Sequence, residues 1–443
     1  MKKMTQQPQI DGSIGWFETA ANKNETLGTP LAGEVSFDVV VIGGGYTGLS
    51  VAARLSERDP ECRIAVVDAL KIGQGTSGRN AGFIIDLPHN IDSSAQNLEH
   101  DLWVHRLNTF AIERLRGFKT EFTIDCQWDE AGKYMAAHEP EHLQGLEGFM
   151  STLNKGQFAY EYLEGEALAQ RLGTSYYRAA VYTAGNILMN PAALIRGIAK
   201  GLSTRISIYE RTPVHAIDYG QTGQATRLYT ANGIINATKV VVTVSAFAEA
   251  FGLAKHRLAP VFTYASLTDP LPASQVDALF SGVRAWGLTS AHPAGSTVRL
   301  TPDNRIMVRN SFDFAPKLSH TEAQRQRARE QHKRSFQARF PELSQVPFAH
   351  TWGGLLCMTL NHHSVFQQVA DNVFVVCGCN GVGVASGTYL GYYMAEYMHG
   401  TDSEALRFIQ ANSQPRWVPP DPIRSLGATL TLKNEMRKAK GEV

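Results

Sequence analysis

The sequence predicts an α/β fold, and three neighbouring stretches carry that prediction. The stretch "FDVVVI" (37–42) has the pattern of a fully buried strand, and "LSVAARLSER" (49–58) has apolar residues at helical spacing. Glycines lie between them at positions 43, 45 and 48, in the spacing G-x-G-x-x-G. A second buried strand, "CRIAVVDA" (62–69), follows the helix. Strand, glycine turn, helix and strand in this order are typical of a Rossmann-like unit.

Length and charge limit the function classes. The chain has 443 residues, enough for a large core and about three domain equivalents. Its formal net charge of +1 gives no electrostatic reason to expect a nucleic acid partner. No stretch is apolar enough to predict a transmembrane helix, and the N-terminus lacks the apolar core of a signal peptide. Five scattered cysteines favour a reducing, cytoplasmic setting.

The glycine turn predicts a dinucleotide site. Gly43 would allow the tight turn, Gly45 would let the backbone approach a pyrophosphate, and Gly48 would let the helix pack on the strand. The helix start, at Tyr46 and Thr47, offers free N–H groups to phosphates. Asp68 ends the second strand 20 residues after Gly48, where such folds place a carboxylate on the adenosine ribose.

A second glycine-rich loop favours FAD over NAD. The segment "KIGQGTSGRNAGFI" (71–84) follows the second strand, and a longer flavin cofactor gives such a loop a purpose. We expect its small residues to keep backbone close to the cofactor and its polar residues to donate at the phosphate and flavin end; the expected contacts are Ser77, Gly78, Arg79, Asn80, Ala81 and Gly82. A mobile surface loop is the alternative.

Four stretches together resemble a known family. "VIGGGYTGLSVAARL", "IGQGTSGRNAG", "LTPDNRIMV" and "GCNGVGVASGTYLGYYMAEYMHG" are similar to D-amino-acid-oxidase-type FAD-dependent oxidoreductases, and among these to the gamma-glutamylputrescine oxidoreductase branch. The resemblance runs from about Gly15 to the C-terminus. It implies a Rossmann-like FAD-binding domain interleaved with an α+β substrate domain built on an antiparallel sheet.

The expected domains are therefore discontinuous. The FAD-binding domain would comprise 36–90, 181–257 and 346–400, and the substrate domain 91–180 and 258–345, with a leader at 1–35 and an extension at 401–443. Asn190 is expected to cap a helix that begins at Pro191. Residues 302–304 would turn a hairpin. The stretch 321–340 predicts a basic helix ended by Pro341.

The resemblance also implies further cofactor contacts. Val214, after Pro213, would meet the adenine through its backbone. A strand, a glycine loop and a helix beginning near Val384 would direct the helix N-terminus at the flavin ring and stabilise the negative charge of reduced flavin. The expected contacts in this loop are Gly378, Gly381, Val382, Gly383 and Val384. Cys379 and Asn380 depart from the family pattern there.

The remaining cysteines and histidines do not predict a metal site. The pair Cys377 and Cys379 lacks a second pair at zinc spacing, and His362 and His363 lack partners. Some relatives attach flavin through a cysteine near the position of Cys357. Its spacing to Gly378 matches them poorly, so we expect a buried Cys357 and non-covalent FAD.

The resemblance implies oxidation of a carbon–nitrogen bond in a small amine or amino acid. A neutral amine would lose hydride to flavin N5, the imine would hydrolyse, and oxygen or a quinone would reoxidise the flavin. Arg305 and Arg309 alternate onto one strand face, and Arg309, where the branch tends to have a small residue, is a candidate for a substrate carboxylate. Phe83, Trp352 and Asn380 are the other pocket candidates.

Two other functions remain open from the residues alone. One is a nicotinamide-dependent dehydrogenase, since its cofactor would use the same Rossmann unit. The other is an RNA-modifying flavoprotein that uses the basic helix 321–340. The arginines of that helix are more simply explained as a solvated face.

Overall fold

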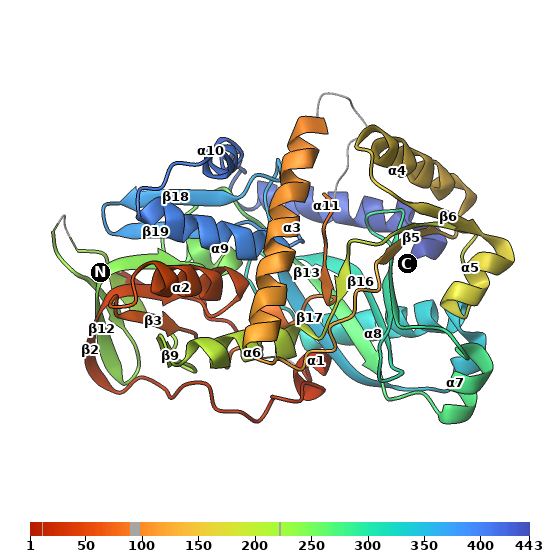
Figure 1. The fold of residues 1–443 in the computed structure, drawn as a ribbon, viewed down its shortest axis with the longest axis horizontal. Helices are drawn as coiled ribbons and strands as arrows, with labels where there is room; N and C mark the ends of the chain where they lie inside the picture. The colour runs from red at the N-terminus through yellow and green to blue at the C-terminus, as the bar shows by residue number, and fades with distance from the viewer. Residues whose placement is uncertain (11, 89–97, 221–222) are drawn as a thin grey trace.

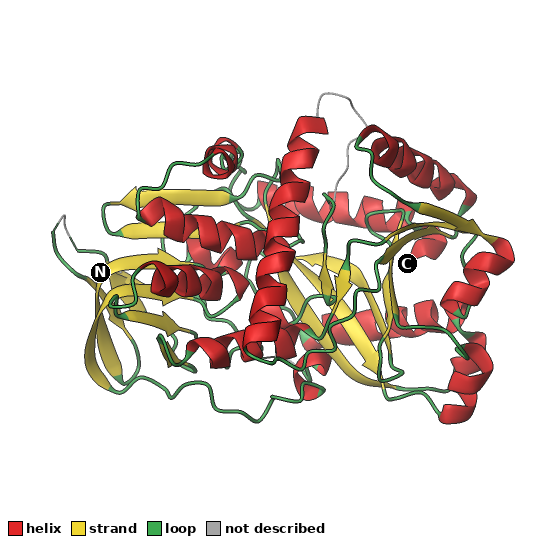
Figure 2. Ribbon diagram, in the orientation of Figure 1, coloured by secondary structure: helices red, strands yellow, loops and turns green. Residues whose placement is uncertain are grey.

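The computed structural model describes residues 1–10, 12–88, 98–220 and 223–443. Two large sheets stand side by side, each with its own helices (Figure 1). Figure 2 shows the strands of the two sheets as separate groups, with the long helix α3 (Leu98–Glu121) upright between them. The N-terminus lies on the side of the first sheet and the C-terminus on the side of the second.

A parallel core forms the centre of the first sheet. Strand β2 (Gly33–Ile42) pairs in parallel with β3 (Ile64–Val67) and with β12 (Gly233–Val242). The core is extended in parallel by β9 (Ser207–Tyr209) next to β3 and by β19 (Val373–Cys377) next to β12. Helices α2 (Tyr46–Arg58) and α9 (Ala385–Met398) pack against each other on one face (Figure 1). The expected Rossmann-like unit is confirmed.

The leader joins this sheet. Strand β1 (Lys2–Lys3) pairs antiparallel with β10 (Ala216–Asp218), which continues through β11 (Thr226–Tyr229) to β12. The short helix α1 (Gly15–Glu18) buries its two aromatic residues, Trp16 and Phe17, in the core. The first residues are therefore part of the fold, because their backbone completes a sheet edge.

The second sheet is antiparallel except for one parallel pair, β14 with β5. The basic helix α8 (Glu322–Arg339) packs against it. The expected hairpin around 302–304 joins β15 to β16. In spatial order, the strands are β17 (Phe348–Met358), β13 (Ala259–Thr268), β16 (Ile306–Phe314), β15 (Thr297–Leu300), β14 (Trp286–Ser290), β5 (Lys133–Ala137), β7 (Ala179–Thr183) and β6 (Glu161–Glu164).

The boundaries between the two sheets differ from the expected ranges at two places. Strand β17 lies within 346–400, the range assigned to the FAD-binding domain, but it pairs with β13 of the second sheet. Helix α3 lies within 91–180, the range assigned to the substrate domain, but it packs on α9 and α6 (Pro191–Leu202). The boundary between residues 90 and 91 lies outside the described residues.

The other elements are shorter. A two-stranded sheet joins β4 (Phe83–Ile84) to β8 (Ile187–Leu188), and β18 (Val365–Ala370) flanks β19. A 3-10 helix, η4 (Ser245–Glu249), follows β12. The rest are α4 (Leu143–Lys155), α5 (Gly165–Leu172), α7 (Ala273–Leu279), α10 (Glu404–Ala411) and α11 (Ile423–Lys438), with 3-10 turns η1 (Thr76–Gly78), η3 (Pro140–His142), η5 (Pro341–Leu343) and η6 (Lys440–Glu442).

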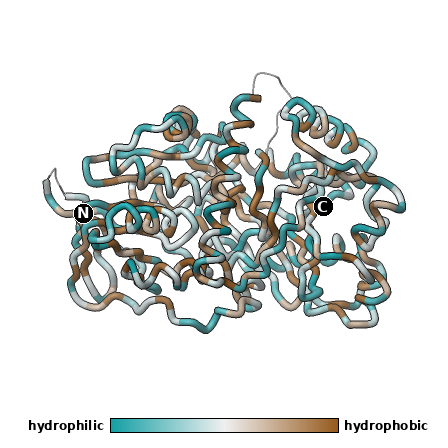
Figure 3. Tube along the Cα trace, in the orientation of Figure 1, coloured by the Kyte–Doolittle hydropathy of each residue, from teal (hydrophilic) through white to brown (hydrophobic). Residues whose placement is uncertain are grey.

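Hydrophobic and hydrophilic segments alternate along the described parts of the chain (Figure 3). Over the described ranges, no helix has the length and apolar character needed to cross a membrane.

The solvated face expected for the basic helix is wrong for several of its arginines. Arg325 and Arg329 donate to backbone carbonyls of Thr351 and Phe348, which tie α8 to β17. Arg339 is buried and donates to Tyr177 and Ser335. Guanidinium groups that satisfy carbonyls of their own fold are not available to a phosphate backbone. The sequence showed the charges but not the strand edge that they meet.

Helix α8 also carries a buried histidine whose titration should affect stability. His332 has no exposed surface, and its Nδ1 lies 2.7 Å from the hydroxyl of Ser266. Burial lowers the pKa of His332 to about 3, and the cations Arg309 and Arg329 add to the effect. Below pH 6.5, the ordinary pKa of histidine, His332 binds a proton in the unfolded chain but stays neutral in the folded chain. The free energy of unfolding therefore falls as the pH falls.

We expect this histidine to cost about 1.4 kcal/mol of stability for each pH unit below its ordinary pKa. The loss should continue until the folded pKa of about 3 is reached. Urea unfolding of the wild type and of His332→Gln at several acidic pH values measures it. The variant lacks the titrating group, so its stability should fall less steeply with acid. Parallel pH profiles for the two proteins would contradict the assignment.

Candidate functional site

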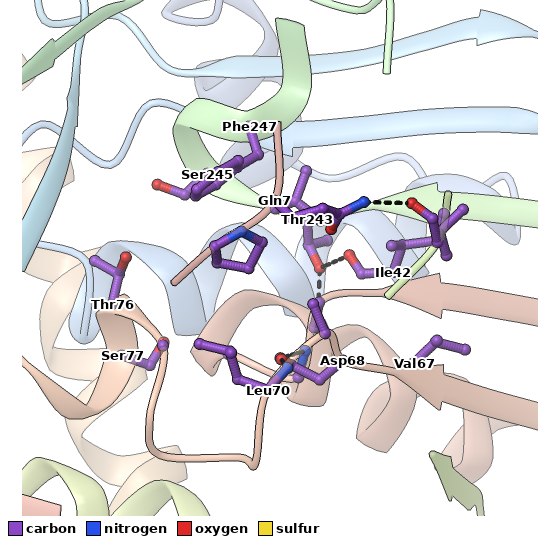
Figure 4. Close-up of a pocket in the computed structure, with 18 of the residues that line it drawn as sticks. Gln7, Ile42, Val67, Asp68, Leu70, Thr76, Ser77, Thr243, Ser245 and Phe247 are labelled. Atoms are coloured by element: carbon purple, nitrogen blue, oxygen red, sulfur yellow. Dashed lines mark hydrogen bonds between the residues drawn. The ribbon is translucent and has the colours of Figure 1, made fainter. Parts of the chain in front are cut away.

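A cavity lies beside the carboxyl ends of β2 and β3 in the first sheet (Figure 4). The first glycine turn and the second glycine loop both line it. Five of the cofactor contacts expected from the sequence line it, namely Gly43, Gly45, Asp68, Ser77 and Val214. The neighbouring glycines Gly44, Gly73 and Gly75 line it as well. Brought together, these residues form the crevice that open parallel sheets present to ligands.

The three motif glycines have the geometry that their expected roles require. Gly43 has a φ of +108°, which favours glycine, and a Cβ there would lie 2.7 Å from the carbonyl oxygen of Thr243. Gly45 lines the cavity, so a side chain would project toward the space of the ligand and toward Ser77. At Gly48 a Cβ would collide with the carbonyl oxygen of Gly43, since helix and strand approach closely there.

Asp68 and the start of α2 form the polar wall of the cavity. The Asp68 carboxylate accepts hydrogen bonds from the backbone N–H groups of Gly44 and Leu70, both at 2.8 Å. Burial raises the pKa of Asp68, and these two N–H groups oppose the rise. The first-turn N–H of Tyr46 donates to the Ser77 hydroxyl at 3.1 Å. A carboxylate acceptor and a helix N-terminus fit the ribose and the phosphates of an ADP group.

The leader covers one side of this cavity, whereas nothing in the sequence indicated that its residues would line a cofactor site. Residues 6–8 line it, and the Gln7 amide donates to the Val214 carbonyl at 2.8 Å (Figure 4). The first ten residues carry no motif and no clear periodicity, so no signal pointed to them. Other lining residues that the sequence analysis missed are Leu70, Thr76, Thr212, Thr243, Val244, Ser245, Phe247 and Phe251.

Two residues of the second loop have a different role from the expected one. The Arg79 guanidinium donates to the carbonyls of Gln74, Gly353 and Gln9. The Asn80 amide donates to the Ser77 carbonyl and accepts from the N–H of Gly82. These side chains shape and anchor the loop. Contacts to a cofactor would come from its backbone, and Ala81 and Gly82 remain expectations for that role.

The C-terminal glycine loop meets the first motif through two helices. Helix α9 begins after Val384 beside the start of α2, and a Cβ at Gly387 would lie 2.8 Å from the Thr47 hydroxyl. Both helix N-termini therefore face the same region, as an extended dinucleotide would require. Gly378, Gly381, Val382 and Gly383 lie in this loop between β19 and α9, and their contacts to a cofactor stay a prediction.

Three pocket candidates have structural partners. Trp352 has no exposed surface, and its indole N–H donates to the Arg79 carbonyl at 3.1 Å. Phe83 is buried in the small sheet of β4 and β8. The Asn380 amide donates to the carbonyls of His362 and Gly378. Core packing and loop bracing account for all three.

Arg309 is the pocket candidate without a polar partner. It pairs in register with Ala265, which also pairs with Trp352, so both side chains point to the face of the second sheet that meets the second glycine loop. Within the described residues its guanidinium has no hydrogen bond or ion pair, and it lies 4.8 Å from the Phe312 ring centre. Burial lowers the pKa of Arg309 to about 10. Arg305, in contrast, is paired with Asp303 at 2.9 Å.

Arg299 is a buried cation that the sequence analysis missed. One of its terminal nitrogens donates to the carbonyls of Ala81, Gly82 and Met189. Its Nε and its other terminal nitrogen have no partner in the described part of the chain. Burial lowers the pKa of Arg299 to about 9. The sequence feature that could have indicated this buried cation is a single arginine within the apolar strand "TVRL".

A scan against protein-family models matches residues 38–397 to the family described as DAO, FAD dependent oxidoreductase. The match spans both sheets and both glycine motifs. The chain belongs to this family. It is therefore an FAD-dependent oxidoreductase, and the cavity of Figure 4 is the site whose residues would hold the ADP half of FAD.

Curated relatives of this DAO family member span its length. A probable oxidoreductase OrdL from Rhizobium meliloti (strain 1021) is 26% identical over 420 residues, 90% of this chain and 92% of the relative. The gamma-glutamylputrescine oxidoreductase of Escherichia coli (strain K12) is 26% identical over 443 residues, 93% of this chain and 96% of the relative. The resemblance drawn from the motifs is thereby confirmed.

A solved structure shows the same fold. The glycine oxidase of Geobacillus kaustophilus superposes with a TM-score of 0.67 at 17% identity, covering 83% of this chain and 96% of that one. The cofactor of the family is FAD. This excludes the alternative of a nicotinamide-dependent dehydrogenase, because both cofactors would occupy the same glycine turn.

The cysteines of this DAO family member are free. Cys357 is buried on β17 beside Cys377, and burial raises the pKa of Cys379 to about 11. Non-covalent FAD stays our expectation because Cys357, the cysteine considered for attachment, is buried in the core. No group of three or more potential ligands for a metal lies within the described ranges.

Proposed function

We propose that this protein oxidises the C–N bond of a small amine or amino acid that carries a carboxylate group. The observation that carries the proposal is Arg309, a half-buried cation without an acidic partner among the described residues, on the sheet face that meets the second glycine loop. A guanidinium fork that lacks a protein partner matches the two oxygens of a carboxylate.

Family membership supports the reaction class. Bound FAD supplies the hydride acceptor when the amine is oxidised. The chain's own residues would bind the cofactor and orient the substrate. The Asp68 carboxylate and the N-terminus of α2 would hold the ADP half of FAD, and the second sheet would present Arg309 to the substrate. The imine product would then hydrolyse in water.

One curated relative is a gamma-glutamylputrescine oxidoreductase, so gamma-glutamyl or other N-substituted amines are our first choice of substrate. Oxygen or a quinone is the proposed electron acceptor, and five free cysteines favour the cytoplasm as the location.

Anaerobic flavin bleaching identifies the substrate class. The holoenzyme is mixed without oxygen with panels of amines and amino acids, each carboxylate compound matched to a neutral amide or amine analogue. Carboxylate-bearing amines should bleach the flavin, and admission of air then tests whether oxygen restores the colour. Absence of bleaching by every amine would contradict amine oxidation while leaving the FAD assignment intact.

Arg309→Ala then tests the carboxylate anchor. We expect an apparent KM for the carboxylate substrate that is about tenfold to a hundredfold higher, because a charge-assisted pair of about 1.5–3 kcal/mol is lost. The neutral analogue should be unaffected. Arg284→Ala, which removes an arginine whose side chain is 81% exposed, is the matched control.

The two substrates separate the outcomes for Arg309. Equal losses on the carboxylate substrate and its neutral analogue would identify Arg309 as a structural residue. No change on either would place it outside the pocket, and the carboxylate requirement would be withdrawn.

A further inference from the structure

We propose that the C-terminal helix α11 docks this protein on the surface of an anionic phospholipid bilayer. The structure leaves a cluster of apolar side chains exposed there, next to cations that lack acidic partners within the described part of the chain. We call this surface the C-terminal patch; it comprises Leu360, Trp417, Ile423, Leu426 and Leu430 with Arg416, Lys433 and Arg437.

The apolar part of the patch is concentrated in one segment. Nine large hydrophobic side chains of the described residues are exposed, and four of them lie between Trp417 and Leu430. Ile423, Leu426 and Leu430 are 65%, 64% and 59% exposed. Their spacing of three and four residues places them on one helix face. Single exposed leucines are ordinary on a protein surface, but a cluster marks an interaction site.

Leu360 extends the patch from another part of the chain. The side chain of its neighbour Asn361 donates to the Gln414 carbonyl and accepts from the Arg416 N–H, at 3.1 and 3.0 Å. Leu360 itself is 63% exposed, and Trp417 is 55% exposed. These hydrogen bonds hold the segment of Leu360 against the segment that carries Arg416 and Trp417.

Cations that lack an acidic partner among the described residues flank the apolar residues. Lys433 and Arg437 are exposed and follow Leu430 on the same face of α11, one and two turns further on. Neither has an acidic partner in the part of the chain that the structure describes, nor does Arg416. The acids near the patch are engaged: Asp421 and Glu249 pair with Arg424, and Glu435 pairs with Lys438.

Exposed aliphatic residues, cations and a tryptophan are the kinds of side chain that can meet an anionic lipid surface. The aliphatic side chains would enter the headgroup boundary, where tryptophan is also favoured. The cations would meet lipid phosphates. A second copy of the chain would offer the same face, with unpaired cations and no free acid to meet them. Charge complementarity therefore favours the lipid surface.

The patch adjoins the flavin side of the molecule. The loop that carries Leu360 is tied to the C-terminal glycine loop, because the Asn380 amide donates to the His362 carbonyl and accepts from the Thr359 N–H, both at 2.8 Å. A bilayer in contact with the patch would lie beside that glycine loop. The proposal does not depend on which amine is oxidised, so it can fail or succeed independently of the proposed function.

Vesicle flotation of the FAD-loaded full chain tests the docking. We use vesicles of phosphatidylcholine alone and vesicles with about a third phosphatidylglycerol, which gives an anionic surface. The wild type should float with the anionic vesicles, stay behind with the neutral ones, and dissociate when salt is raised.

Two variants separate the apolar and the cationic contributions. Leu426→Ser/Leu430→Ser should weaken partitioning by more than about tenfold, because the apolar area that enters the bilayer is lost. Lys433→Gln/Arg437→Gln should weaken it by about fivefold for each charge removed. Val369→Ser, at an exposed apolar residue outside the patch, is the control and should bind like the wild type. All substituted side chains are exposed, so the yellow FAD absorbance should be unchanged and confirms folding.

Three results would overturn the proposal. The first is failure of the wild type to float with anionic vesicles. The second is equal loss of binding in Val369→Ser and the leucine variant. The third is a dimer in sedimentation velocity without lipid, which the leucine variant disperses while no protein binds vesicles. That third result would assign the patch to self-association.

Discussion

Replacement of Gly45 by valine is expected to yield purified protein without FAD. Gly45 caps α2 and lines the cavity, and its Cβ position lies 2.6 Å from the Ser77 hydroxyl oxygen. A branched side chain there would fill the space that a pyrophosphate needs beside the helix N-terminus. The ratio of flavin absorbance to protein absorbance in the purified variant measures the effect.

Two further variants calibrate the loss of FAD. Gly117→Ala, in the interior of α3 with no atom within 4 Å of the added methyl, should keep its full FAD content. Asp68→Ala should bind FAD more weakly without abolishing it, since it removes hydrogen bonds to ribose of about 1–3 kcal/mol. Full flavin content in Gly45→Val would show that the turn does not contact the pyrophosphate.

Asn190→Ala is expected to destabilise the fold by about 3 kcal/mol, because it combines two losses. The side-chain amide oxygen Oδ1 of Asn190 caps α6 by accepting from the backbone N–H groups of Ala192 and Ala193, at 3.1 and 3.0 Å. Its amide also donates to the Trp16 carbonyl at 3.0 Å. Asn190 is only 2% exposed, so water cannot replace these bonds. Urea unfolding gives the difference in free energy from the wild type.

The control is another helix cap. Ser403 caps α10 by accepting from the Leu406 N–H at 3.2 Å, at a more exposed site. Ser403→Ala should cost about 1 kcal/mol, the ordinary value for an N-cap. A cost for Asn190→Ala no greater than that of Ser403→Ala would show that the bond to Trp16 contributes nothing.

Local patterns predicted the elements whose geometry depends on neighbouring residues. The glycine turn at 43–48, the Asn190 cap, the hairpin around 302–304 and the buried strand ending at Asp68 all have short-range causes, and the structure has them at those positions. Periodicity and capping act over a few residues, so one sequence is enough to recognise them.

Partners that are distant in sequence could not be predicted in this way. The carbonyls that occupy Arg79 and Arg325 belong to other elements, and nothing near either arginine indicates them. Strand β17 was placed with the wrong sheet because an apolar strand does not show which strand it will pair with. The contribution of residues 6–8 to the cavity depends on β1 reaching β10, a pairing that no local signal marks.

The covering of the cavity by the leader sets an order of events for cofactor loading. Lys2 pairs with Ile217 and Gln7 bonds to the Val214 carbonyl, so these residues find their partners only after a segment more than 200 residues further along the chain has folded. Until that pairing forms, the cavity stays open on the side of Val214. Once it has formed, FAD can leave on that side only after β1 detaches. We therefore expect exchange of the cofactor in the folded protein to depend on the opening of β1, as well as on the contacts within the cavity.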